Sequence, residues 1–238
     1  MTNLKKYPLI SIIINCYNGE KYLNECIKCV LGQSYKNWEI VFLDNNSSDQ
    51  SVQVINTYKD KRIKLFYNRN KSHLSLYKAR NLAISHAKGE YITFLDVDDL
   101  WKKNKLKEQV NCSKKNPNIK IIYSNYSVLN EQKKLFYTQY KKKLPSGFIA
   151  QKLLDSYCTG VATLFIEKKL FKKYKFKDRY SIIGDFDLII RLSIKYKIMS
   201  IQKPLSIYRV HGSNLSLRRA DIYIKELKYW LRYVCEYE

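Results

Sequence analysis

The sequence predicts an α/β fold with a single, mostly parallel central sheet flanked by helices and a less regular second half. Through the first hundred residues, short apolar runs rich in β-branched side chains alternate with segments of helical periodicity. Such alternation is typical of parallel sheets whose two faces are covered by helices. The length of 238 residues favours one sizeable core, because two small domains would each bury too little surface.

The first half contains four expected strands, each a short run of apolar and β-branched residues: 9–15, 38–43, 63–67 and 91–95. Helices with one apolar face separate them: 18–31, a helix through Val52, Ile55 and Tyr58, and 75–87. Asn18 stands at the expected N-cap of the first helix. Gly32 and Gly89 follow the first and third helices as stop signals.

The second half has weaker patterns. We expect helices at 105–115 and 186–196, and extended segments at 119–124 and 161–166. Residues 135–143 form a basic, tyrosine-bearing stretch. The pattern of residues 220–238 predicts a separate amphipathic helix. We expect residues 1–219 to form the main domain. The apolar face of that helix consists of Leu227, Trp230, Leu231 and Val234, with Lys225, Lys228 and Arg232 among its polar positions.

The formal net charge is +23, from 44 Lys and Arg against 21 Asp and Glu. This charge indicates either an anionic partner (nucleic acid, a membrane surface or a phosphate-rich substrate) or many solvated lysines without a partner. The six cysteines are scattered, and neither an export signal nor an apolar stretch long enough for a membrane span is recognisable. We expect a cytoplasmic protein with reduced thiols. We expect no zinc site, because no second pair or histidine completes the Cys26–Cys29 motif.

Three carboxylates follow the fourth expected strand: Asp96, Asp98 and Asp99. Charges this close repel one another, and a hard cation such as Mg²⁺ or Mn²⁺ relieves the repulsion while sharing its oxygen ligands with phosphates. The motif therefore predicts a metal that stabilises a departing diphosphate. The alternative is an acidic turn in which Asp99 caps the following helix.

Other polar residues also stand where expected strands end. Asn15 and Tyr17 follow the first strand, and Asp44 ends the second. Ligands bind at the carboxyl ends of parallel strands, so we expect these residues to open onto one crevice with Asp96. Asp44 offers a hydrogen-bond acceptor to a base or a ribose, and Tyr17 offers a stacking surface. The alternatives are a loop cap and an ordinary packed tyrosine.

Three residues farther along the chain are also candidates. Arg80 is able to pair with the aspartates or with phosphate, or to be an ordinary surface arginine. Asp185 precedes a helix and is placed to be a catalytic base; alternatively, Asp185 or Asp187 caps that helix. His211 follows an apolar segment and is expected to face the crevice, with a structural role as the alternative.

Six segments together resemble the family 2 glycosyltransferases of the GT-A fold. In the family's order they are 10–23 (ISIIINCYNGEKYL), 33–49 (QSYKNWEIVFLDNNSSD), 79–84 (ARNLAI), 87–99 (AKGEYITFLDVDD), 184–192 (GDFDLIIRL) and 203–216 (KPLSIYRVHGSNLS). They are spread along the chain from residue 10 to residue 216, and six motifs in register are far more specific than any one. The resemblance implies a Rossmann-like sheet, a nucleotide-diphospho-sugar donor, Mn²⁺ or Mg²⁺ and, for most members, inversion at the anomeric carbon.

The same resemblance assigns roles to the other candidate residues, whereas Arg80 stays a donor-side candidate from its own chemistry. It places Asn15, Tyr17 and Glu20 around the nucleobase, Asp44 on a uracil or thymine base, Asp96 at the ribose, Asp98 on the metal, Asp185 as the base and His211 near the metal or diphosphate. Residues 1–100 would form the nucleotide-binding half and 101–219 the acceptor-binding half. The family often has Glu-Asp where this chain has Gly184 and Asp185, so one acid is missing.

The expected reaction moves a sugar from a UDP- or dTDP-sugar to a hydroxyl of a glycan or lipid-linked glycan, in surface polysaccharide synthesis. Two other classes stay open. A nucleotidyltransferase needs a glycine-rich phosphate loop, for which residues 15–19 are a poor match. A nucleic-acid-binding module, suggested by the tyrosines and lysines of 137–143, leaves the ordered aspartates unexplained, so no nucleic-acid partner is expected. The C-terminal helix is compatible with peripheral contact to an anionic membrane, or with packing on the domain or a partner.

Overall fold

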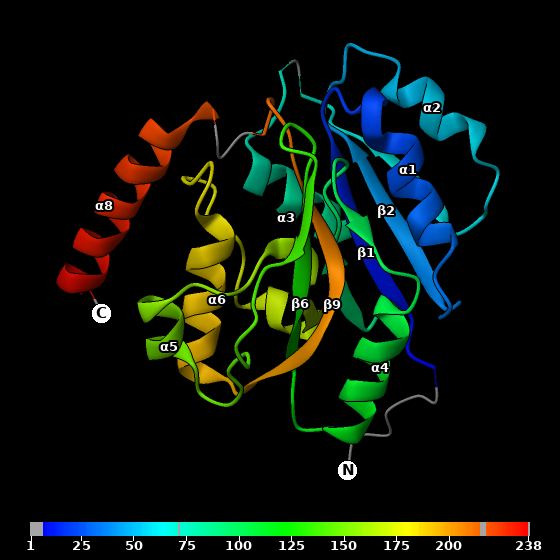
Figure 1. The fold of residues 1–238 in the computed structure, drawn as a ribbon. Helices are drawn as coiled ribbons and strands as arrows, with labels where there is room; N and C mark the ends of the chain where they lie inside the picture. The colour runs from blue at the N-terminus through cyan, green and yellow to red at the C-terminus, as the bar shows by residue number, and fades with distance from the viewer. Residues whose placement is uncertain (1–6, 71, 215–217, 238) are drawn as a thin grey trace.

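The computed structural model describes residues 7–70, 72–214 and 218–237, and it confirms the predicted α/β class (Figure 1). Within those residues nine strands form one sheet in the order β3-β2-β1-β4-β8-β6-β9-β5, with β7 paired to β6. The strands are β1 (Ile10–Cys16), β2 (Trp38–Asp44), β3 (Ile63–Tyr67), β4 (Tyr91–Phe94), β5 (Leu100–Trp101), β6 (Ile121–Asn130), β7 (Leu135–Thr138), β8 (Phe165–Glu167) and β9 (Ile198–Val210).

The first four strands are parallel, as the alternating pattern predicted. Their crossover helices are α1 (Glu20–Leu31), α2 (Ser51–Thr57) and α3 (Leu76–His86). Because parallel strands share one direction, the carboxyl ends of β1, β2 and β4 meet at the same edge of the sheet. That edge is where the polar residues following each strand come together.

The second half departs from this pattern. β8 runs antiparallel to both β4 and β6, whereas β9 runs parallel to β6 along most of its length. The predicted extended segment 161–166 is wrong in its first part, because Val161–Thr163 is a turn of 3-10 helix and only Phe165–Glu167 is strand. The helices here are α4 (Lys105–Lys115), α5 (Ala150–Asp155), α6 (Gly184–Lys195) and α8 (Ala220–Tyr237), with a 3-10 turn at Lys168–Lys172.

Two apolar cores lie on the two faces of the sheet. Alternate residues of β1 point to opposite sides, so Ile13 packs with α3 and α6 while Ile12 and Ile14 pack with α1 and α4. All three isoleucines are almost completely buried. Each buried isoleucine contributes about 1.5–3 kcal/mol relative to an exposed one. Packing in the two cores fixes the positions of the strand ends that carry the polar residues.

The predicted N-cap at Asn18 is wrong. Asn18 adopts a left-handed backbone (φ 53°), and its side-chain oxygen accepts the backbone N–H of Ser48 at 2.8 Å. The first free amide of α1, that of Glu20, instead donates to Asp49 Oδ2 at 3.0 Å. The loop before α2 therefore caps the N-terminus of α1. The two residues in this contact, Glu20 and Asp49, are 29 positions apart in the sequence.

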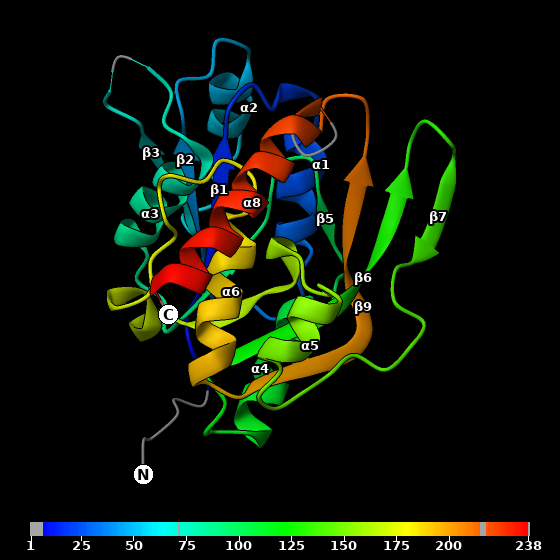
Figure 2. The same cartoon turned by 90° about the vertical axis from the view of Figure 1, so that its left-hand side faces the viewer.

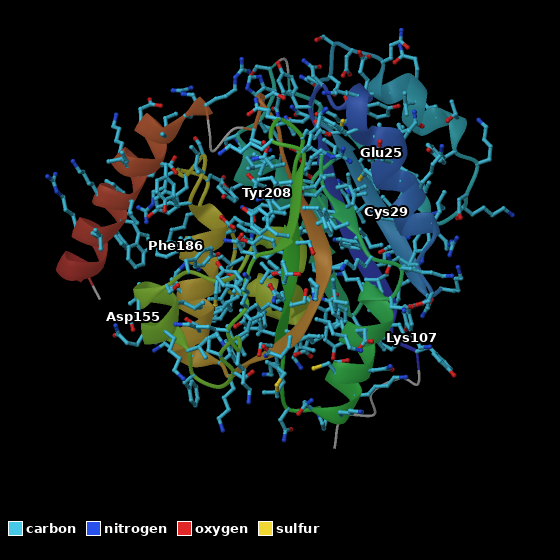
Figure 3. The ribbon with its side chains drawn as sticks, in the orientation of Figure 1. Glu25, Cys29, Lys107, Asp155, Phe186 and Tyr208 are labelled. Atoms are coloured by element: carbon cyan, nitrogen blue, oxygen red, sulfur yellow. The ribbon has the colours of Figure 1, made fainter. Side chains whose placement is uncertain are left out.

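Helix α8 packs along α6, which was one of the outcomes expected for the C-terminal segment (Figure 2). Trp230 is 4% exposed, and its ring contacts that of Phe186 at a centroid distance of 4.9 Å. Phe186 lies on the side of α6 that faces α8 (Figure 3). The indole N–H of Trp230 donates to Asp187 Oδ1 at 3.2 Å. Among the described residues, no helix is long and apolar enough to cross a membrane.

Candidate active site

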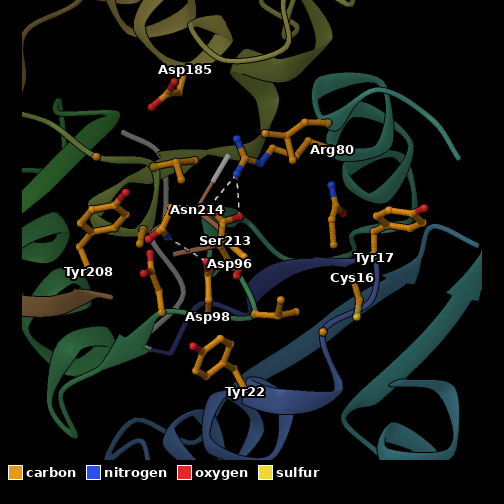
Figure 4. Close-up of a pocket in the computed structure, with 18 of the residues that line it drawn as sticks. Cys16, Tyr17, Tyr22, Arg80, Asp96, Asp98, Asp185, Tyr208, Ser213 and Asn214 are labelled. Carbon is orange, nitrogen blue, oxygen red and sulfur yellow. Dashed lines mark hydrogen bonds and ion pairs between the residues drawn. The ribbon is translucent and has the colours of Figure 1, made fainter. Parts of the chain in front are cut away.

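A cleft of about 1110 Å³ opens at the carboxyl ends of β1 and β4 (Figure 4). Its floor comes from the strand ends and the start of α1, and its opposite wall from β6, β9 and the segment before α6. Eight of the nine residues predicted for the site line it: Asn15, Tyr17, Glu20, Arg80, Asp96, Asp98, Asp185 and His211. The fold thus brings together residues that lie up to almost 200 positions apart in the chain.

Asp44 is the exception, because it is not among the residues that line the cleft. It is 4% exposed at the end of β2, and only its neighbour Asn45 reaches the cleft lining. Asp44 Oδ2 accepts the backbone N–H of Ser47 at 3.3 Å, as the loop-cap alternative proposed. Asp44 Oδ1 is buried without a hydrogen-bond partner in the structure. A buried carboxylate oxygen without a partner is costly, so this atom is an acceptor available to a ligand N–H.

Asn15, Tyr17 and Glu20 lie at the β1 end of the cleft. Both polar side-chain atoms of Asn15 are buried, and neither has a hydrogen-bond partner among the residues that the structure describes. Tyr17 is 50% exposed and stacks on the ring of His73 at 4.7 Å. Glu20 borders the cleft, but its Oε2 accepts the backbone N–H of Gln50 at 2.7 Å, so this carboxylate also stabilises the start of α2. Asn15 and Tyr17 therefore present more free recognition groups than Glu20 does.

Arg80 and Asp96 form an ion pair in the middle of the cleft. Arg80 Nη2 lies 2.6 Å from Asp96 Oδ1 and 2.9 Å from Oδ2. Arg80 is 3% exposed, so the surface-arginine alternative is wrong. The pairing predicted between Arg80 and the aspartates is confirmed. A buried guanidinium that spans both carboxylate oxygens fixes the orientation of Asp96.

Asp98 lies beside the imidazole of His211, with its Oδ2 2.9 Å from His211 Nε2. Asn214, which sequence reasoning missed, bridges the pair: its side-chain nitrogen is 3.3 Å from Asp98 Oδ2, and its oxygen accepts the His211 backbone N–H at 2.5 Å. Burial and the nearby charge of Asp96 raise the pKa of the Asp98 carboxyl. The signals available for Asn214 were its position three residues after a candidate histidine and its place in the family-like segment 203–216.

The Asp98–His211 pair has the donor chemistry of a Mn²⁺ or Mg²⁺ site, with a carboxylate oxygen and an imidazole nitrogen. Among residues 7–70, 72–214 and 218–237, no three His, Cys, Asp or Glu side chains are grouped as a complete metal site. Two protein ligands fit a cation that takes its remaining ligands from a bound diphosphate and water. Asp99, in contrast, accepts the backbone N–H of Arg209 at 3.0 Å, so its predicted alternative role as a helix cap is wrong.

Asp185 lies on the wall opposite Asp98, with the Arg80–Asp96 pair between them in the view of Figure 4. Its Oδ1 is 3.0 Å from the hydroxyl of Tyr77. Burial raises the pKa of the Asp185 carboxyl, while Arg80 and the Tyr77 hydrogen bond oppose that rise. A raised pKa and exposure to the cleft are what a general base requires.

The amides that precede α6 are satisfied by a residue that sequence reasoning missed. Glu226 of α8 accepts the backbone N–H groups of Ser181, Ile182 and Ile183 at 2.5, 3.0 and 3.1 Å. Neither Asp185 nor Asp187 supplies a side-chain cap to this helix. Asp187 is instead buried and forms ion pairs with Lys177 and Arg191. Asp185 is therefore left free to face the cleft.

Tyrosines line the wall formed by the second half of the chain: Tyr126, Tyr157 and Tyr208, with Tyr22 from α1. The Tyr22 ring lies 4.9 Å from that of His211, and its hydroxyl donates to Glu131 at 2.9 Å. Sequence reasoning missed this aromatic wall because 21 tyrosines are spread along the chain without a motif. Rings with one polar atom each are suited to stacking on sugar faces while hydrogen-bonding hydroxyl groups.

The fold is similar to that of solved glycosyltransferases. A mannosyltransferase from Pyrobaculum calidifontis, solved with GDP-Man and Mn²⁺, superposes with a TM-score of 0.70 over 96% of this chain and 65% of that one, at 16% identity. TarS 1–349 from S. aureus superposes with a TM-score of 0.68 over 84% of this chain and 60% of that one, at 19% identity. TarS has also been solved with UDP and with UDP-GlcNAc. These likenesses confirm the predicted GT-A type of fold.

Relatives are also found by sequence. The UDP-Glc:alpha-D-GlcNAc-diphosphoundecaprenol beta-1,3-glucosyltransferase WfgD of Escherichia coli is 35% identical over 168 residues, which span 71% of this chain but only 64% of that protein. An uncharacterized glycosyltransferase of Haemophilus influenzae is 36% identical over 214 residues, 88% of this chain and 82% of that protein. The model of glycosyl transferase family 2 matches residues 11–175. On these matches, the chain belongs to glycosyl transferase family 2.

Proposed function

We propose that this protein is an inverting, metal-dependent glycosyltransferase that moves a sugar from a UDP- or dTDP-sugar to an acceptor hydroxyl. The observation that carries the proposal is the placement of Asp98 with His211 on one wall of a single cleft and Asp185 on the other. One wall offers ligands for a diphosphate-bound cation, and the other offers a free carboxylate. Both walls belong to one cleft of about 1110 Å³.

The β1 end of the cleft is the proposed nucleotide subsite. The unpartnered atoms of Asn15 and Asp44 Oδ1 are suited to the N–H and carbonyl groups of a pyrimidine base, and Tyr17 to its ring. Glu20 borders the same subsite, and Asp96, oriented by Arg80, is placed toward the ribose. The UDP and UDP-GlcNAc complexes of TarS support a uridine nucleotide. In this proposal residues 1–100 form the nucleotide-binding half.

Asp98 and His211 would hold Mn²⁺ or Mg²⁺ next to the donor diphosphate. The Mn²⁺ complex of the Pyrobaculum mannosyltransferase supports this assignment. The cation would neutralise the negative charge that develops on the departing nucleoside diphosphate. Asn214 keeps Asp98 and His211 in contact, so it acts on the cation through both of them.

Asp185 acts as the general base of a single displacement. Its carboxylate takes the proton of the acceptor hydroxyl as that oxygen bonds to the anomeric carbon and the bond to the diphosphate oxygen breaks. Attack from the wall opposite the diphosphate inverts the anomeric configuration. Residues 101–219, which supply Asp185 and most of the tyrosine wall, form the proposed acceptor half.

The acceptor is proposed to be a glycan or a lipid-linked glycan of surface polysaccharide synthesis. The support is the Escherichia coli relative, whose name gives a GlcNAc-diphosphoundecaprenol acceptor. The tyrosine wall lines the same cleft as Asp185, where the acceptor sugar would bind. A lipid-linked acceptor would bring the enzyme to the inner face of the cell membrane.

Peripheral membrane contact is proposed through the outer face of α8. There Ile224 and Leu231 are 53% and 50% exposed, next to the exposed cations Lys225, Lys228 and Arg232. Apolar side chains between cations suit the interface of an anionic bilayer. The β6–β7 hairpin adds a second surface of this kind, where Leu135, Phe136 and Tyr137 are about half exposed beside Lys133 and Lys134.

Vesicle binding tests the membrane proposal. Each cation near an anionic surface contributes about 1 kcal/mol, so K225Q/K228Q/R232Q is expected to weaken binding to phosphatidylglycerol vesicles by about 10²-fold. The matched control K59Q/K61Q/K64Q removes three exposed cations near β3, at the far edge of the sheet, and is expected to bind like the wild type. Equal loss in both variants, or no binding by the wild-type protein, would contradict the proposal.

Product analysis with a panel of nucleotide-sugars tests the proposed reaction itself. Glycosyl transfer, or slow donor hydrolysis without acceptor, releases a nucleoside diphosphate, whereas the rival nucleotidyltransferase reaction releases or consumes pyrophosphate. Salt-sensitive binding of random oligonucleotides without release of nucleoside diphosphate would instead support the nucleic-acid-binding alternative.

A further inference from the structure

The ring of Tyr77 fills the space that a side chain at position 184 would need, beside the proposed base. A Cβ atom built on Gly184 would lie 2.5 Å from both Cδ2 and Cε2 of the Tyr77 ring. Real side chains do not approach this closely, so any other residue at position 184 would displace the ring. Tyr77 is 1% exposed and stacks on Phe176 at 5.2 Å, which leaves the ring little freedom to move. The glycine that replaces the acid often found at this position therefore makes room for a tyrosine.

The Tyr77 hydroxyl has two acceptors but only one proton. It lies 2.5 Å from the carbonyl oxygen of Ile182 and 3.0 Å from Asp185 Oδ1. When Asp185 is ionised, the hydroxyl is able to donate to its carboxylate. When Asp185 carries a proton, the carboxyl is able to donate to the tyrosyl oxygen while the hydroxyl donates to Ile182. The same three atoms thus satisfy both protonation states of Asp185.

We propose that Tyr77 is a positioning residue for the general base, whose hydroxyl turns between Asp185 and the Ile182 carbonyl as Asp185 gains and loses a proton. This inference rests on the proposed role of Asp185. The acceptor proton moves from the acceptor oxygen to the Asp185 carboxylate, and Tyr77 keeps its own proton throughout. No side chain of the protein other than Asp185 changes its protonation state.

The second acceptor is held in place from outside the cleft. Glu226 of α8 accepts the amides of Ser181, Ile182 and Ile183, so the peptide that carries the Ile182 carbonyl is anchored on both sides. Trp230 anchors the same region through Phe186 and Asp187. Helix α8 therefore fixes the distance between the two acceptors that Tyr77 serves.

The charged and titratable groups around Asp185 set the direction of the expected pH effect. From α3, Arg80 and Tyr77 lower the pKa of Asp185, and burial raises it. Tyr157 faces it from the loop after α5. On its own helix, Asp187 is neutralised by Lys177 and Arg191, and on α8 the Glu226 carboxylate is occupied by backbone amides. Removal of the Tyr77 hydroxyl removes a contribution that favours ionised Asp185, so the pKa of the base rises.

The test is the pH dependence of kcat in Tyr77→Phe. We expect the acidic limb of the kcat profile to move up by about one pH unit, so that kcat at a fixed pH on that limb falls roughly tenfold, with the KM for the nucleotide-sugar within twofold of wild type. The matched control is Tyr35→Phe, which removes another buried hydroxyl that donates to a carbonyl, that of Pro8, away from the cleft. The control is expected to keep the wild-type profile.

A second variant tests the same proposal independently, in case Tyr77→Phe does not fold. Gly184→Ala forces the Tyr77 ring away from Asp185, so it is expected to give the same shift, and the double variant G184A/Y77F is expected to add no more than twofold to the loss. A wild-type pH limb in folded Tyr77→Phe, or additive losses in the double variant, overturns the proposal. If Asp185→Asn retains turnover, the proposed base fails as well; if Asp185→Asn is inactive and Tyr77→Phe is normal, only the role of Tyr77 fails.

Discussion

Asp185→Asn is expected to lower kcat by about 10²- to 10⁴-fold, the range that a positioned general base contributes. Asparagine keeps the size and polarity of the side chain but does not take up the acceptor proton. The proposed nucleotide subsite lies at the β1 end of the cleft, so the Kd of the nucleotide-sugar, measured by calorimetry, is expected to stay within about twofold. The pH dependence carries the same information, because burial raises the pKa of Asp185. Turnover in the wild type is expected to fall as pH drops through that raised pKa, and so at a higher pH than for an ordinary carboxyl of pKa about 3.9.

Asp178→Asn is the matched control for that experiment. Asp178 lies seven residues earlier, on the same side of α3, and accepts the Asn81 side chain at 2.9 Å without lining the cleft. It undergoes the same loss of charge and is expected to keep near-normal kcat. Full turnover by Asp185→Asn would remove Asp185 from the role of base. An equal loss in both variants would indicate a general effect of charge instead.

Chelation with EDTA is expected to reduce transfer by about 10³-fold or more, and Mn²⁺ or Mg²⁺ to restore it, since a cation at a departing diphosphate contributes several kcal/mol. Asp98→Asn and His211→Ala are expected to raise the Mn²⁺ concentration needed for half-maximal activity. Asn214→Ala should raise it by about 10- to 100-fold, because Asn214 orients the two proposed ligands without binding the metal. Mn²⁺ titrations of kcat measure all three effects.

His73→Ala is the matched control for the histidine. His73 stacks on Tyr17 at the rim of the nucleotide subsite, so its loss is expected to change the KM for the donor but not the Mn²⁺ requirement. Undiminished activity in excess chelator would refute the metal assignment. A normal Mn²⁺ requirement in both Asp98→Asn and His211→Ala would place the metal elsewhere.

The sequence by itself determined the parallel half of the fold and most of the candidate site. Strand and helix periodicities are local properties, so β3 and α4 match their predicted bounds and β1, β2 and β4 agree to within one residue. Ligands bind at the carboxyl ends of parallel strands, and this rule depends only on strand direction. It therefore predicted that Asn15, Asp96 and Asp98 lie at one cleft, as they do. Asp185 and His211 were candidates from their places beside a helix and an apolar segment, but their roles at the same cleft came from the resemblance to the family, since no local pattern relates them to strands a hundred residues away.

Only the tertiary structure decided which acidic and aromatic side chains face the cleft and which are buried or hydrogen-bonded elsewhere. Burial depends on how the whole chain packs, and it leaves the Asp44 side chain almost completely buried at the end of β2. Hydrogen-bond partners distant in sequence decided that Glu226 satisfies the amides before α6, and that Asp185 faces the cleft with Tyr77 beside it. The contact between Tyr77 and Gly184 joins two positions 107 residues apart, each unremarkable alone. Such pairings depend on side-chain packing in three dimensions, which the periodicity of a sequence does not encode.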